Sequence, residues 1–209
     1  MDVYEAMAAR MTIRDFADRE ISRDLLTKLV AAGFQAPTNN HLREWHFVLL
    51  QDRQRRKDLL DQVIKPLDRK GAIGVVNRWG MTDDVQRVMY IEAIPKQYAM
   101  LMTAGALIFP CFCQPSPLLK PKDLSALNAF ASIWCCIENI LVAAAAEGIF
   151  GVTRIPFDAE RKTIKQFLAI PEPYEVPCYL ALGYPQAGAG RAKQVAIPIE
   201  ERIHAETWG

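Results

Sequence analysis

Apolar residues recur at helical spacing in several segments of this chain. Ser22 is a good N-cap residue, and one apolar face follows it, formed by Leu25, Leu26, Leu29 and Val30. The same spacing predicts a short helix from Val3 to the arginine at position 10. It also predicts longer helices over 54–64, 85–102 and 158–168, and the helix over 85–102 is expected to be broken near Pro95. We interpret 54–64, which is rich in Arg and Lys, as a solvated surface helix.

The longest periodic segment runs from Ser125 to Glu147, and Gly148 ends it. It is rich in alanine and apolar on most sides. A helix of this kind has to be covered, either in the middle of the fold or at a subunit interface.

Four short segments have the pattern of β-strands. Residues 105–113 form a continuous apolar run, which predicts a central strand buried on both faces. Further strands are expected over 46–51, 149–155 and 178–184. Trp45, just before the first strand, is expected in the core.

Two stretches lack a clear pattern. Residues 66–84 contain Gly71, Gly74 and Gly80 and predict a long loop. Residues 186–209 predict an extended tail whose apolar residues need cover, for which a partner subunit is an economical source. We therefore expect one domain over 1–185, followed by this tail.

Composition and net charge argue against some classes of partner. The 209 residues are 51% hydrophobic and 23% charged, as in ordinary globular proteins. A net charge of +1 gives no long-range field toward nucleic acid or an anionic membrane, so neither partner is expected. No signal-like segment and no apolar run clean enough to span a bilayer is recognised, which predicts a soluble, cytoplasmic protein.

The five cysteines, an odd number, all lie in apolar segments, which favours buried free thiols over disulfides. Cys111 and Cys113 are spaced wrongly for a zinc knuckle, and Cys135 and Cys136 would point to different faces of a helix. No metal centre is expected.

The most informative polar motif is Arg10-Met11-Thr12-Ile13-Arg14. If one turn presents both guanidinium groups with the Thr12 hydroxyl, a phosphate dianion can bind there. The alternative is an arginine that faces the negative end of the preceding helix.

A polar, turn-rich loop over 35–47 lies between a helix end and a strand, a good position for ligand contact. His41 and His46 lack carboxylate or cysteine partners at metal-ligand spacing and are expected at the surface.

Four separated features together resemble the nitroreductase family of FMN-dependent oxidoreductases. They are the arginine motif at 10–14, the Ala36-Pro37-Thr38 loop with Trp45 and Phe47, the buried helix followed by 151–157, and Leu180-Ala-Leu-Gly-Tyr-Pro185. The resemblance implies an α+β fold, a three-layer sandwich with a mixed or antiparallel central sheet flanked by helices. It also implies an intertwined homodimer with two FMN sites, each built from both subunits.

The resemblance assigns cofactor contacts by position. Arg10 and Thr12 would contact the FMN phosphate, Arg14 would lie near flavin N1 and O2, and the backbone of Ile155, which precedes Pro156, would meet N5. Arg191 or Lys193 could complete the phosphate site. The remaining cofactor-binding candidates are Met11, Pro37, Thr38, Asn39, Asn40, His41 and Arg43. His41, Arg43 and Glu44 depart from the family's usual Asn, Gln and Pro, which suggests altered electronics or another substrate.

The implied activity is an NAD(P)H-dependent flavin oxidoreductase with ping-pong kinetics. NADH or NADPH would reduce the flavin, and a small electron acceptor such as a nitroaromatic, quinone or enone would reoxidise it. Two alternatives stay open: an FMN-binding store or sensor without turnover, and a specialised dehalogenating or flavin-fragmenting branch of the same fold.

Overall fold

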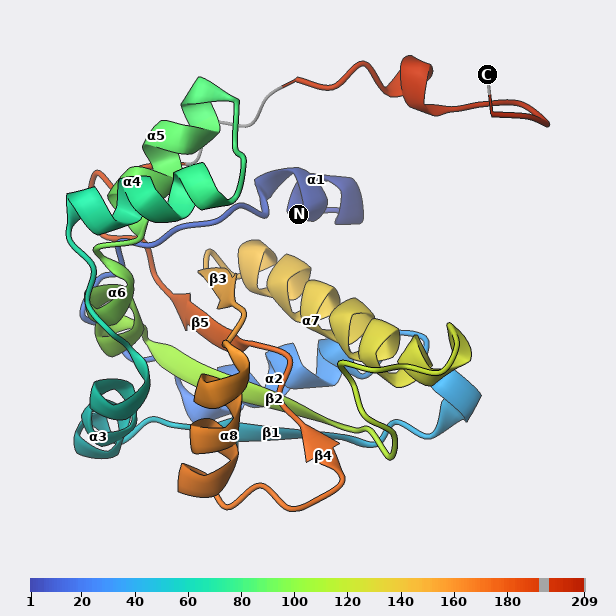
Figure 1. Cartoon of the computed structure of the whole chain (residues 1–209), viewed down its shortest axis with the longest axis horizontal. Coiled ribbons are helices and arrows are strands. Elements are labelled where there is room, and N and C mark those ends of the chain that lie inside the picture. The colour runs from blue at the N-terminus through green and yellow to red at the C-terminus, as the bar shows by residue number, and fades with distance from the viewer. Residues whose placement is uncertain (192–195, 209) are drawn as a thin grey trace.

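The computed structural model describes residues 1–191 and 196–208. Its centre is a β-sheet in the order β1-β2-β5-β3, with a short fifth strand, β4, beside β2 (Figure 1). Neighbouring strands pair antiparallel. The strands are β1 (Trp45–Leu49), β2 (Ala106–Cys113), β3 (Phe150–Arg154), β4 (Tyr174–Glu175) and β5 (Tyr179–Gly183).

The predicted central strand is confirmed, because β2 pairs with β1, β5 and β4. Its side chains alternate between two separate cores. Leu107, Phe109 and Cys111 point into one core, and Ala106, Ile108 and Phe112 point into the other. A strand buried on both faces reads as an unbroken apolar run, which is the pattern found in the sequence.

Helices cover both faces of the sheet (Figure 1). One core includes side chains of α2 (Arg23–Gly33) and α7 (Asn128–Ala146), and the other includes side chains of α3 (Arg53–Val63), α6 (Gln97–Thr103) and α8 (Asp158–Phe167). The remaining helices are α1 (Val3–Ala9), α4 (Arg69–Arg78), α5 (Asp84–Ala93), and the 3₁₀ turns η1 (Asn39–His41), η2 (Ser125–Leu127) and η3 (Ile199–Arg202). The predicted three-layer α+β architecture is confirmed.

The prediction of a long loop over 66–84 is wrong, because this stretch contains α4. Asp68 caps the helix by accepting the N–H of Gly71 at 2.8 Å. Ala72 and Val76 are buried against Ile94, next to α5. This packing outweighs the helix-weakening effect of the glycines, and the sequence pattern does not reveal it.

The predictions of a solvated helix over 54–64 and of five buried thiols are also wrong in part. Arg56, in the helix interpreted as a solvated face, is only 3% exposed and donates to four backbone carbonyl oxygens. Cys135 is exposed and Cys113 is half-buried, whereas the other three thiols are buried. Burial raises the pKa of the Cys111 and Cys136 thiols to about 12.

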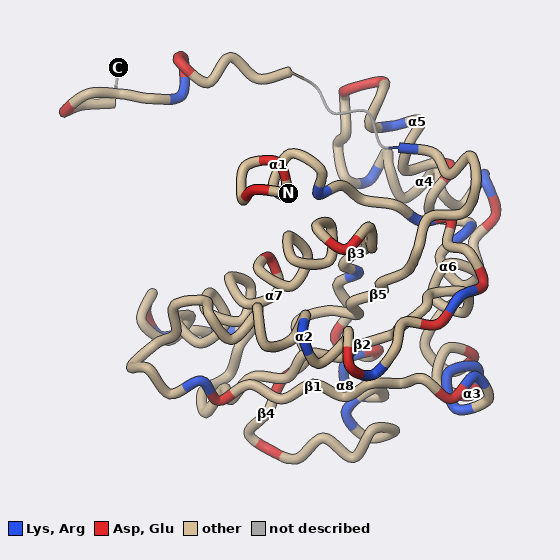
Figure 2. Tube along the Cα trace, turned by 180° about the vertical axis from the view of Figure 1, so that it is seen from behind, with Lys and Arg blue, Asp and Glu red and all other residues tan. Residues whose placement is uncertain are grey.

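Residues 125–146 are long and apolar enough to cross a membrane by length and composition, contrary to the expectation that no segment would be. The physical reason is that α7 is a core helix whose uncovered side is apolar as well. Its buried residues are Ile133, Cys136, Ile137, Ile140, Ala144 and Ala145. Few charged residues lie along α7, whereas basic and acidic residues are interspersed elsewhere (Figure 2).

Candidate functional site

The arginine motif lies in an extended segment directly after α1. Thr12 forms an isolated parallel bridge with Gly151 of β3, so the segment runs beside this strand in the same direction. Ile13 is buried in the core that includes side chains of α3, α6 and α8, and Met11 packs against the same core. These apolar anchors hold the arginines on either side of them in place.

Arg14 is a partly buried cation. Burial lowers the pKa of its guanidinium group, although Tyr90 of α5 and Asp15 act in the opposite direction. Its guanidinium carbon lies 5.8 Å from the centre of the Tyr90 ring. Within the described part of the chain, Arg14 makes neither a hydrogen bond nor an ion pair. A partly desolvated cation that makes no ion pair is a suitable partner for an anionic ligand.

Arg10 has a different environment. It is the C-cap residue of α1, and its Nε lies 3.2 Å from Oε1 of Glu138 in α7. Both side chains are partly exposed. The side chain of Arg10 therefore pairs with α7, its backbone N–H donates to the carbonyl of Ala6 at the end of α1, and its two terminal nitrogens make no hydrogen bond within the described residues.

The second candidate region is the loop over 37–43, which is strained. Asn40, His41 and Arg43 have φ values of 50°, 57° and 50°, in the left-handed region that non-glycine residues rarely adopt. The Oγ1 of Thr38 accepts the N–H of Arg43 at 3.3 Å, which closes the loop. Strain of this kind clusters at ligand-binding positions. Pro37 and the three strained residues are exposed.

These two regions are not brought together within one chain. The loop contacts α7 near its start, where the N–H of Asn39 donates to Oγ of Ser132 at 3.0 Å, whereas Arg10 contacts Glu138 six residues later. A small hollow of about 30 Å³ lies under the loop, between β1, β2 and the start of α7, and no residue of the arginine motif lines it.

The remaining predicted residues lie apart from the loop. Ile155 is 68% exposed and begins the turn that leads from β3 through Pro156 to α8. Arg191 is exposed, and Lys193 lies outside the described residues. The structure thus places the arginine motif and the Ile155 turn along the same strand.

The corner between α5 and α6 also belongs to this region, and sequence reasoning did not assign it a role. Tyr90 faces Arg14, Lys96 lies 3.5 Å from Asp15, and Gln97 contacts the last residue of β3. These three contacts within eight residues arise from packing, and the 66–102 segment carries no sequence motif that could have identified them.

Comparison with known proteins agrees with this arrangement. The sequence pattern of the family described as "Nitroreductase family" matches residues 7–184. The chain belongs to the nitroreductase family. A provisionally assigned NADH dehydrogenase/NAD(P)H nitroreductase of Archaeoglobus fulgidus is similar, with 26% identity covering 95% of this chain and 94% of the relative.

Solved structures of nitroreductase relatives share the fold. Iodotyrosine deiodinase bound to FMN and 3-iodo-L-tyrosine has a TM-score of 0.74 at 14% identity, covering 99% of this chain and 100% of that one. NADPH:FMN oxidoreductase from Vibrio harveyi complexed with NAD+ has a TM-score of 0.68 at 16% identity, covering 99% and 78%. The predicted family and fold are confirmed, and the predicted class, a flavin oxidoreductase, agrees with this membership.

Proposed function

We propose that this nitroreductase-family chain is an FMN-dependent oxidoreductase that uses NADH or NADPH to reduce a small, electron-poor acceptor such as a nitroaromatic or quinone, with ping-pong kinetics. The observation that carries the proposal is Arg14, a partly buried cation with no ion-pair partner in the described chain, on a segment parallel to β3. An anionic ligand would supply the missing counter-charge.

The residues present fit FMN. Its phosphate needs charged donors, and Arg10 keeps two terminal nitrogens available besides the Nε that faces Glu138. The flavin ring needs a cation at its pyrimidine edge, and Arg14 is separate from Arg10 along an anchored segment. When bound, FMN would supply the electron transfer between the nicotinamide and the acceptor.

Each residue then has a physical task. Arg10 and Thr12 would hold the phosphate, and Arg14 would stabilise negative charge near N1 and O2. The backbone N–H of Ile155 would donate to the N5 edge. The strained loop at 38–43 would contribute ligand contacts, and the cations of the tail, Arg191 or Lys193, would complete the phosphate site.

We further propose a homodimer with an FMN site between subunits. The strained loop and the arginine motif contact α7 at different positions, so a second copy offers an economical way to bring the two regions together. The apolar residues Val3, Tyr4 and Met7 of α1 and Ile199, Ile203 and Trp208 of the tail are exposed in the single chain. Residues 1–185 would form the FMN-binding domain, and 186–209 a tail that packs on the partner. A cytoplasmic location stays a prediction.

The absorption spectrum of the purified protein, followed by anaerobic mixing with NADH and NADPH, tests the proposal. A flavin spectrum that one of the nicotinamides bleaches rapidly, and that a nitroaromatic or quinone restores, is expected. Flavin that stays oxidised would indicate a store or sensor instead. Reduced flavin that only a halogenated aromatic reoxidises would indicate a dehalogenating enzyme.

A further inference from the structure

A buried ion pair closes the turn between β3 and α8. The carboxylate of Glu160 accepts Nη1 of Arg154 at 2.6 Å and Nη2 at 2.8 Å, and also the backbone N–H of Phe157 at 3.3 Å. Both charged side chains are 12% exposed. Paired, parallel contacts between a guanidinium and a carboxylate fix orientation as well as distance.

Arg154 is held from two further directions. Its Nε donates to Oε1 of Gln97 at 3.0 Å, at the start of α6. Its guanidinium carbon lies 4.9 Å from the ring centre of Tyr179, the residue opposite it in β5. All three guanidinium nitrogens therefore have partners, and the last residue of β3 is joined to β5, α6 and α8.

The turn that this ion pair closes is itself exposed and apolar. Ile155 is 68% exposed and Phe157 is 73% exposed. The buried ion pair of Arg154 and Glu160, which also binds the N–H of Phe157, holds the turn rigidly although its apolar side chains are uncovered. Rigid placement of a surface turn is useful where its backbone must meet a ligand in one geometry.

The turn also lies at the end of the strand along which the arginine motif runs. Because Thr12 bridges Gly151 and the two segments are parallel, Arg14 advances toward the same end of β3 as Arg154 and the turn. The α5–α6 corner supports both, through Tyr90 beside Arg14 and Gln97 beside Arg154.

We propose that Arg154 and Glu160 are positioning residues that hold the backbone of the 155–157 turn against the flavin edge. This inference rests on the proposed function. N5 of the oxidised flavin accepts a hydrogen bond, whereas N5 of the reduced flavin carries a hydrogen of its own, so a backbone donor held at N5 would favour the oxidised flavin over the reduced one. Without the ion pair, the turn can move and this preference weakens.

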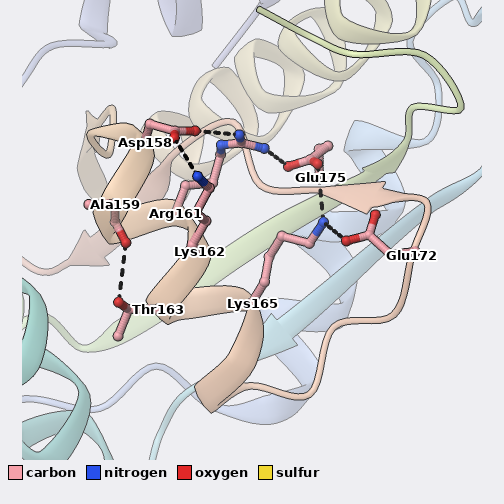
Figure 3. A network of polar contacts seen from close by, with 8 residues as sticks. All are labelled: Asp158, Ala159, Arg161, Lys162, Thr163, Lys165, Glu172 and Glu175. Atoms are coloured by element: carbon pink, nitrogen blue, oxygen red, sulfur yellow. Dashed lines mark hydrogen bonds and ion pairs between the residues drawn. The ribbon is translucent and has the colours of Figure 1, made fainter.

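Glu175 of β4 offers a matched control, because it pairs with residues of the same helix. Its carboxylate, 15% exposed, pairs with Arg161 and Lys165 of α8 (Figure 3). Neither of these contacts involves the side chain or backbone N–H of the 155–157 turn. Glu160→Gln and Glu175→Gln therefore each remove one partly buried negative charge beside α8, and only the first releases the turn.

The midpoint potential of bound FMN and its dissociation constants in both redox states would be measured for both variants. Removal of a negative charge alone raises the potential, because the site becomes more positive. Loss of a donor at N5 raises it further, because the oxidised flavin loses a hydrogen bond that the reduced flavin does not make. We expect Glu160→Gln to raise the potential well above that of Glu175→Gln, with oxidised FMN bound on the order of tenfold more weakly relative to reduced FMN. Glu175→Gln should leave the potential unchanged or slightly raised.

A potential of Glu160→Gln that is no higher than that of Glu175→Gln, with a similar loss of apoprotein stability, would overturn the inference in favour of a merely structural ion pair. Glu160→Asp keeps the charge but shortens the side chain, so it decides the question if the Gln variant does not fold. Its potential should rise above that of the unmodified protein, and an unaltered value would contradict the inference. Failure of the unmodified protein to bind FMN would instead refute the proposed function.

Discussion

Arg56 connects three elements on one side of the sheet, and its replacement should be costly. The side chain donates to the carbonyl of Leu50, after β1, and to the carbonyls of Leu101, Met102 and Ala104 at the end of α6. The shortest of these contacts, to Ala104, is 2.7 Å. Burial lowers the pKa of the guanidinium group, which nevertheless stays protonated at neutral pH.

The magnitude follows from the number of acceptors. In Arg56→Met, four buried or partly buried carbonyls lose a charged donor, and each loss costs about 1 kcal/mol, so the free energy of unfolding should fall by about 4 kcal/mol. In Arg56→Lys, a single ammonium has three donors at one point and cannot reach every carbonyl, so we expect about half that loss.

Urea unfolding of the apoprotein at one fixed protein concentration measures the effect. Arg55→Met is the control, because Arg55 is exposed on the same helix and its replacement should change stability by less than about 0.5 kcal/mol. A loss below about 1 kcal/mol in Arg56→Met would refute the reasoning, since the carbonyls would then have other partners.

Four further outcomes are expected. Arg14→Ala should retain FMN at a lower midpoint potential, and an unaltered potential in a spectroelectrochemical titration rules out its proposed role. Arg10→Ala should lose about 2 kcal/mol of FMN binding, or roughly thirtyfold in dissociation constant by fluorescence titration, and purification as a fully yellow protein contradicts this. In urea unfolding, Gly33→Ala should be destabilising by about 1–3 kcal/mol, because its Cβ would lie 2.7 Å from a side-chain atom of α7. Gly74→Ala in α4, with open space around it, should instead be stabilising by up to about 1 kcal/mol. The opposite order of the two stabilities argues against the packing described. Removal of residues 186–209 should weaken the proposed homodimer in sedimentation velocity, and an equally stable dimer excludes a role for the tail in association.

Local patterns were sufficient for most elements. The strand at β2 was predictable because burial on both faces leaves no polar position in it. The start of α2 was predictable because Ser22 accepts the N–H of Leu25 within one turn, at 3.3 Å. The family resemblance was likewise recognisable from the sequence, because it rests on short motifs that occur in a fixed order along the chain.

Long-range contacts account for the failures. The helix α4 depends on packing of Ala72 and Val76 against Ile94, about twenty residues away, and its glycines suggested a loop. Arg56 resembles its exposed neighbours in sequence, and only the position of the α6 carbonyls explains its burial.

Apart from α4, the sequence by itself determined which segments form the main helices and strands, and it showed which residues carry charge suited to a mononucleotide, because both depend on neighbours within a few positions. Only the tertiary structure decided that Arg14 has no ion-pair partner among the described residues, that Arg10 faces Glu138, and that the Arg154–Glu160 ion pair closes the turn after β3. The physical reason is that burial and pairing of charge depend on elements that meet through packing, and a residue's own sequence neighbours do not specify them.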